Sequence, residues 1–109
     1  MTSASTMRIV GDWDSRAVWV DGEPLDPVPS QGVWNHSPDG FNWGYAGSGP
    51  AQLALALLLK AGLSPQRAVR LHQEFKFAVI ARLPQDSFAI EFDVADWVER
   101  NAPDGGSAR

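Results

Sequence analysis

The segment with the clearest chemical potential is residues 43–50, where glycines precede the start of an apolar helix. Glycines at such a place leave backbone N–H groups free at the positive end of the helix dipole, which is how proteins often hold anions. The segment lacks the Lys-Ser/Thr ending of a P-loop, and its glycine spacing differs from the dinucleotide fingerprint. The alternative is a purely structural corner between a strand and the helix. The candidate ligand- or partner-binding residues here are Trp43, Tyr45, Gly47, Ser48 and Gly49.

The two histidines of the chain, His36 and His72, have no companion at the spacing of a metal pair or a catalytic triad. A structural role is therefore favoured for His72, and an exposed turn position for His36. Cysteine is absent, which removes thiolate metal sites, disulfides and cysteine nucleophiles. We expect no metal, no cofactor and no catalytic residue, and an enzyme is the class with the least support.

Tryptophan is unusually frequent, with five in 109 residues and four of them in the N-terminal half. A small core cannot easily bury them all, so some are expected at a surface. Tryptophan is a favoured anchor of protein interfaces and also stacks on nucleic-acid bases. Trp34 and the adjacent His36 are therefore further candidates for partner binding.

Basic residues are concentrated in the middle of the chain, where residues 46–83 carry five of them against one glutamate. The favoured interpretation is that they balance the acidic ends across the folded surface. The alternative is a weak nucleic-acid site on the second helix. Its candidate residues are Arg67, Arg70, Lys76 and Arg82.

The elements that position these residues begin with short strands. The β-favouring runs 8–13 and 17–20 flank a three-residue turn and predict a hairpin. Residues 23–30 contain three prolines, so we expect an extended connector there and neither a central strand nor a helix. Aromatic runs at 33–35 and 41–45 flank a Ser-Pro-Asp-Gly turn and predict a second hairpin.

Two consecutive helices are expected to follow. The first opens with Pro50 at its first position, has no polar face through residue 59 and is predicted to be buried. Gly62 ends it, and Ser64 with the proline after it opens the second helix. Three- and four-residue spacing of apolar residues extends this second helix to about Arg82.

A strand and a last helix complete the predicted domain. Residues 87–92 alternate between apolar and polar side chains, which is typical of a half-buried strand, and Asp93 then caps the helix. The order of elements predicts an α+β fold, ββββααβα, in a single domain over residues 8–101. Residues 1–7 and 102–109 are expected to be flexible tails.

Composition agrees with a soluble globular protein. The hydrophobic fraction is 44%, the charged fraction is 20% and the formal net charge is −4, which argues against a surface that coats nucleic acid throughout. No signal peptide is recognisable, and the longest apolar run, at 53–59, is too short to cross a bilayer. We expect a cytoplasmic protein with no membrane partner.

The string FNWGYAGSGPAQLALALLL at 41–59, with VWVDG upstream and LHQEFK downstream, resembles an uncharacterised family of small bacterial, archaeal and phage proteins. The distinctive part is the core W-G-Y-x-G-S-G-P-A-Q-L-A, and the resemblance covers most of residues 8–101. It implies no activity and no catalytic roles. The occurrence of the family in phages and mobile elements implies an accessory function.

Three hypotheses on function follow. The leading one is a small non-enzymatic binding or adaptor protein, whose partner is another protein or a second copy of this chain. The first alternative is a small-ligand, nucleotide or phosphate site at the helix start, residues 47–50. The second alternative is nucleic-acid binding through the basic second helix.

Overall fold

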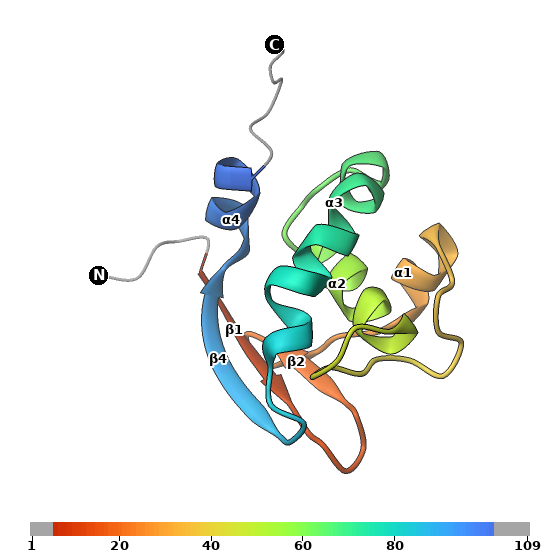
Figure 1. The fold of residues 1–109 in the computed structure, drawn as a ribbon, viewed down its shortest axis with the longest axis vertical. Coiled ribbons are helices and arrows are strands. Elements are labelled where there is room, and N and C mark those ends of the chain that lie inside the picture. The colour runs from red at the N-terminus through yellow and green to blue at the C-terminus, as the bar shows by residue number, and fades with distance from the viewer. Residues whose placement is uncertain (1–5, 102–109) are drawn as a thin grey trace.

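A four-stranded antiparallel sheet of order β3-β2-β1-β4 forms one layer of the structure, a computed structural model that describes residues 6–101 (Figure 1). The last strand pairs with the first along its whole length, so segments from both ends of the chain form the sheet. The α+β class predicted from the sequence is confirmed. The strands are β1 (Thr6–Gly11), β2 (Val18–Val20), β3 (Glu23–Pro24) and β4 (Phe88–Asp93).

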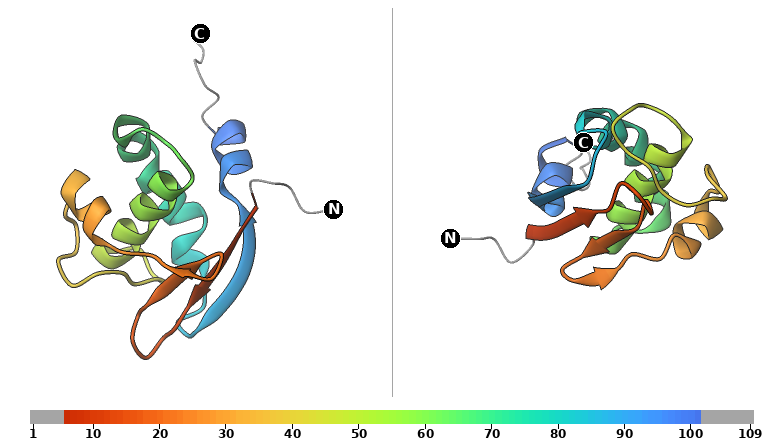
Figure 2. Two further views of the ribbon diagram at one scale, coloured as in Figure 1. Left: turned by 180° about the vertical axis from the view of Figure 1, so that it is seen from behind. Right: turned by 90° about the horizontal axis from the view of Figure 1, so that it is seen from below.

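Helices α2 (Ser48–Lys60) and α3 (Pro65–Ala78) lie against one face of this sheet (Figure 2). Side chains along each strand alternate between the two faces of the sheet. The helices cover the face that carries Ile9 and Val20, and both of these residues are buried. On the opposite face Arg8 lies opposite Glu91 in the register of β1 and β4, and the exposed pair is 3.9 Å apart. The sheet thus has one packed face and one solvated face.

The apolar helix α2 is the centre of the core. Every residue from position 49 to 58 is buried, as predicted from its lack of a polar face. The helix begins at Ser48 with Gly47 as the N-cap, so Pro50 is its third residue and not its first. It ends at Lys60, and Gly62 with φ +100° makes the predicted stop.

Helix α3 starts where predicted, because the Ser64 hydroxyl accepts a hydrogen bond from the backbone N–H of Arg67 at 3.3 Å. The α-helix ends at Ala78, four residues before the predicted end. A 3₁₀ turn, η1 (Ile80–Arg82), follows it. The Ile80 carbonyl accepts a hydrogen bond from Gly44, which ties this turn to the loop before α2.

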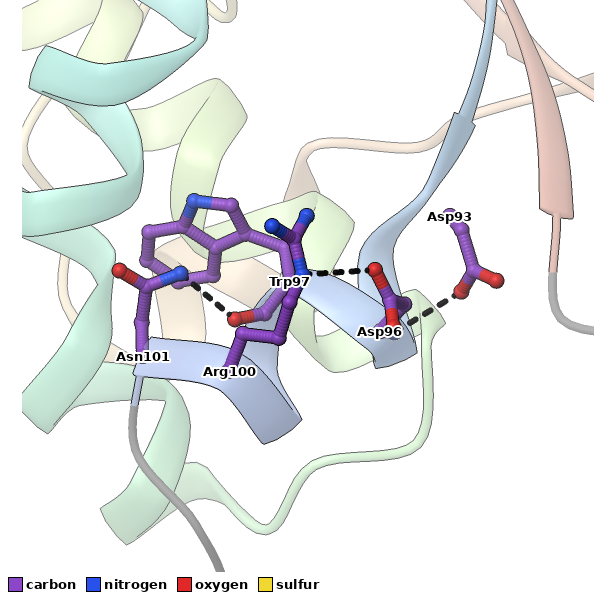
Figure 3. Close-up of polar contacts among 5 residues, drawn as sticks. All are labelled: Asp93, Asp96, Trp97, Arg100 and Asn101. Carbon is purple, nitrogen blue, oxygen red and sulfur yellow. Dashed lines mark hydrogen bonds and ion pairs between the residues drawn. The ribbon is translucent and has the colours of Figure 1, made fainter.

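The predicted start of the last helix, α4 (Val94–Asn101), is confirmed (Figure 3). The Asp93 carboxylate accepts from the backbone N–H of Asp96 at 2.9 Å, which satisfies one of the unpaired donors of the first turn. Asp96 also pairs with Arg100 one turn later.

Two of the sequence predictions for residues 23–45 are wrong. The three prolines do not prevent ordered structure, because Pro24 lies in the short edge strand β3 and Pro29 lies in the first turn of α1 (Val28–Val33). Both are positions where a proline's missing N–H is not needed. Asp26 supports the helix start by accepting from the backbone N–H of Val28.

The second hairpin, predicted over residues 33–35 and 41–45, is also absent from the described residues. The first segment contains the last residue of α1, Val33, and is otherwise irregular like the second, and backbone groups of both bond to side chains instead of to each other. The alternate aromatic positions, Phe41 and Trp43, are buried in the core. The alternation therefore reflects burial of every second residue in an irregular loop.

The domain was predicted to begin at residue 8, yet Thr6 and Met7 already belong to β1. The remainder of the two expected tails, residues 1–5 and 102–109, lies outside the described residues.

Candidate functional site

The fold brings together two candidates from the loop after α1, Trp34 and His36, with His72 and Lys76 on α3. The indole of Trp34 stacks on the imidazole of His36, with ring centroids 4.6 Å apart and planes 20° apart. The His36 and His72 rings meet through their Nε2 atoms, which are 2.9 Å apart. Residues separated by 36 positions in sequence thus make one contiguous cluster.

The hydrogen-bond partners determine where the protons of this histidine pair lie. His72 Nδ1 is 2.6 Å from the carbonyl oxygen of Val69, and a carbonyl only accepts, so Nδ1 carries the proton. In the neutral ring His72 Nε2 is then an acceptor, and His36 Nε2 must donate to it. The Gln73 amide lies 3.3 Å from the same acceptor. The pair is therefore satisfied with both imidazoles neutral.

A buried glutamine holds the segment that carries Trp34 and His36. Gln52 on α2 is fully buried, and its side-chain oxygen accepts from the backbone N–H groups of His36 at 2.7 Å and Ser37 at 2.9 Å. Its NH₂ donates to the Ser30 hydroxyl and the Trp34 carbonyl. Four hydrogen bonds from one side chain fix this irregular segment against the core helix.

Lys76 completes the cluster one helical turn after His72. It is only 8% exposed, and its ammonium nitrogen lies 4.3 Å from the ring centroid of Phe77. Burial lowers the pKa of both histidines below the ordinary value of 6.5, and the positive charge of Lys76 lowers both further. For His36, proximity to His72 acts in the same direction.

We expect the free energy of unfolding to decrease as the pH is lowered through 6.5. The unfolded chain takes up protons at the ordinary pKa, whereas the folded histidines take them up only at lower pH. Between the two pKa values the unfolded state binds more protons, so acid favours unfolding. Urea denaturation between about pH 5.5 and 7.5 measures this slope. A double variant, His36→Gln with His72→Gln, should flatten it, and an unchanged slope in that variant would contradict the assignment.

A recess lies at the start of α2, where the glycine segment was predicted to present its amides. Its volume is about 410 Å³. Arg16 enters it, but its guanidinium is already engaged by the Trp13 ring, 3.5 Å from the centroid, and by the Asn42 side chain. The candidates that line this recess are Tyr45, Ser48 and Gly49.

The glycine segment itself is closely packed. A Cβ added to Gly49 would lie 2.5 Å from Asn42 Cβ, and one added to Gly47 would lie 2.5 Å from the Tyr45 ring. Trp43 is 0% exposed, so it packs in the core and presents no surface to a ligand. These contacts indicate a closely packed turn between the loop and α2. The exposed residues of the segment are Tyr45, Ala46 and Ser48.

The four basic candidates do not share a surface. Arg67 and Lys76 are nine residues apart on α3, which places them about half a turn apart around the helix axis. Lys76 is buried in the cluster, Arg70 is exposed, and Arg82 lies beyond the helix in η1. Arg67 lines a separate recess beside α4.

The sequence reasoning missed the roles of His72 and Gln52. Gln52 had a usable signal, because it is the single polar residue between positions 50 and 59, and a polar side chain within a buried helix needs partners. His72 had a weaker one, namely its four-residue spacing to Lys76, which puts both on one face of α3.

Within residues 6–101 no group of three or more histidine, cysteine, aspartate or glutamate side chains is arranged to hold a metal ion. In the same range, no helix combines the length and the apolar character needed to cross a bilayer.

No curated protein and no solved structure matches the chain. The model of a family of unknown function, DUF6166, matches residues 9–100. Because this match spans nearly the whole described domain, the chain belongs to the DUF6166 family of unknown function.

Proposed function

We propose that this protein is a non-enzymatic binding module that recognises another protein through one aromatic and basic surface. We call this surface the Trp34 face. Trp34 is 48% exposed and Phe77 is 58% exposed, although both are large aromatic side chains. Trp34 stacks on His36, Lys76 lies against Phe77, and the charge of Lys76 acts on both histidines, so we treat these residues as one patch. Its residues are Trp34, His36, Gln73, Lys76 and Phe77.

The observation that carries the proposal is that Trp34 is exposed and yet held in place. Its ring stacks on His36, and its carbonyl is fixed by the buried Gln52. Tryptophans that are already ordered before binding lose little entropy when a partner covers them, and such residues dominate interface energetics. A partner with an acidic surface fits, because the patch contains the charge of Lys76.

Nucleic acid is a poorer fit to the same surface. The four basic candidates do not form one exposed surface, because Lys76 is buried and Arg82 lies beyond α3, and the chain has a net charge of −4. A ligand site in the recess at the start of α2 remains the second candidate, because Ser48 and Tyr45 line it beside the first turn of the helix. Stabilisation of the chain by a nucleotide or phosphate that is lost in Ser48→Ala would support that alternative.

The finer proposal is an accessory role in a phage or mobile element, which the family resemblance implies. The genes that surround family members test it. Neighbouring nuclease, toxin or phage structural genes would support it, and scattered metabolic neighbours would count against it.

We expect Trp34→Ala to weaken partner binding by at least about tenfold, because exposed tryptophan anchors often contribute 2 kcal/mol or more. The partner is first captured from the native host by cross-linking to the tagged chain, and its affinity is then measured with both proteins purified. Val28→Ala is the matched control, since Val28 is also apolar and is 63% exposed, but lies outside the Trp34 face.

The expected pattern is capture by the wild type and by Val28→Ala, with loss in Trp34→Ala. Equal affinity for all three forms would overturn the proposal. Self-association of the purified chain that Trp34→Ala abolishes would show instead that the face binds a second copy.

A further inference from the structure

Three basic side chains lie together in the core of the Trp34 face without an acidic neighbour. We call His36, His72 and Lys76 the basic cluster. In the part of the chain that the structure describes, no carboxylate forms an ion pair with any of the three. Lys76 is more than nine-tenths buried, and an aromatic ring is the contact of its ammonium group. A buried cation without an anion is unfavourable, so the cluster is suited to receive one.

We propose that the basic cluster is the binding site for an oxyanion, a carboxylate or a phosphate group, carried by the partner protein. This inference rests on the proposed function, because it names the chemistry that the Trp34 face recognises. Trp34 and Phe77 would contact apolar parts of the partner on either side of the charged group. Lys76 supplies a fixed positive charge at the centre.

The histidine pair adds a second, proton-dependent source of positive charge. In the neutral pair the His36 N–H is used by His72, so neither ring has an Nε2 donor to offer. The nitrogen of the pair that can still take up a proton is Nδ1 of His36, because His72 Nδ1 and His36 Nε2 already carry protons and His72 Nε2 accepts the hydrogen bond from His36. Protonation there makes His36 a cation and leaves the hydrogen bond between the two Nε2 atoms in place. An oxygen anion can then accept a hydrogen bond from the new N–H of His36.

Anion binding is therefore coupled to proton uptake. The charged groups that face the pair are its own two rings and Lys76, and the polar side chains beside it, Gln52 and Gln73, are neutral. With one proton taken up per anion, affinity should rise by up to about tenfold for each pH unit below neutrality. The affinity stops rising at pH values where the cluster is already protonated without a bound anion.

The test is a titration of the full chain with inorganic phosphate and, separately, with acetate. The imidazole resonances of His36 and His72 report binding by NMR, with sodium chloride at matched ionic strength as the reference. Phosphate or acetate should shift both histidines and raise their pKa. Lys76→Met should weaken this binding by at least about tenfold, whereas Arg70→Met removes an exposed charge from the same helix and should leave it unchanged.

A second variant, His36→Gln, changes a loop residue, and it keeps the inference testable if Lys76→Met does not fold. It should abolish the pH dependence of acetate binding while leaving the His72 resonance observable. A preference for phosphate over acetate indicates a phosphorylated partner, and the reverse indicates an acidic side chain. No shift beyond that caused by chloride, or equal binding by Lys76→Met and wild type, would overturn the inference. The proposed function is tested by a separate measurement, and it is overturned if Trp34→Ala binds the captured partner as tightly as wild type does.

Discussion

Replacement of Trp43 by alanine is expected to lower the free energy of unfolding by about 4 kcal/mol, the middle of the range for a truncated buried aromatic side chain. The indole is completely buried. It meets Phe88 edge-on at 4.9 Å and Trp13 at 5.8 Å between ring centroids. Its Nε1 donates to the Asp86 carbonyl at 2.8 Å. The variant would lose these contacts together and leave a cavity between the loop and β4.

Trp43→Phe separates the two contributions of the side chain. It keeps an aromatic ring against Phe88 but removes the donor to the Asp86 carbonyl, and we expect a loss of about 2 kcal/mol. Urea denaturation followed by circular dichroism measures both variants. Trp34→Ala is the matched control, because the same truncation at a half-exposed ring should cost less than about 1 kcal/mol. Equal costs at the two positions would contradict the buried placement of Trp43.

The contrast between these two tryptophans also shows where sequence reasoning succeeds. The starts of α3 and α4 were predicted correctly because each depends on a local signal, a capping residue and a short stretch of chain. The strand at the C-terminal end, β4, was predicted from its two-residue alternation alone. These features need no knowledge of distant partners.

The structure of residues 23–45 could not be predicted in the same way. Its aromatic alternation looks like that of a strand, but Trp43 is buried between Trp13 and Phe88 of β4, residues that lie 30 positions before it and 45 positions after it in the chain. The loop is held by contacts over long sequence separations, such as Gly44 N–H to the Ile80 carbonyl. Local patterns carry no information about such contacts.

The candidate site follows the same rule. Trp34 and His36 were singled out together as candidates for partner binding and Lys76 separately as a candidate for nucleic-acid binding, with no common location for the three. Their proximity depends on the loop after α1 folding back onto α3. The residue that determines this path, Gln52, is the exception that could have been predicted, since a single amide in an otherwise apolar helix requires partners.

The second large effect is therefore expected at Gln52. Gln52→Leu keeps the approximate size of the side chain but leaves the Ser37 N–H without its acceptor and the His36 N–H with only its 3.1 Å bond to the Trp34 carbonyl. Since the site is fully buried, water cannot replace these bonds without rearrangement. We expect the free energy of unfolding to fall by about 3 kcal/mol, measured by urea denaturation.

Gln85→Leu is the matched control for this variant. Gln85 also donates its amide to a backbone carbonyl, that of Gly44 at 3.0 Å, but it is exposed and water can take its place. Gln85→Leu should change the free energy of unfolding by less than about 1 kcal/mol. Similar effects of the two variants would contradict the view that burial makes Gln52 important.

Amide hydrogen exchange distinguishes a local effect of Gln52→Leu from general destabilisation. A local effect predicts that His36 and Ser37 lose protection first, while the amides of α2 and β1 exchange only through global unfolding. Because the same segment carries Trp34, the folded fraction of the variant should also bind the partner and phosphate more weakly than wild type. Binding that survives with His36 and Ser37 unprotected would show that the Trp34 face does not depend on this glutamine, and that its order arises from the stacking of Trp34 on His36 alone.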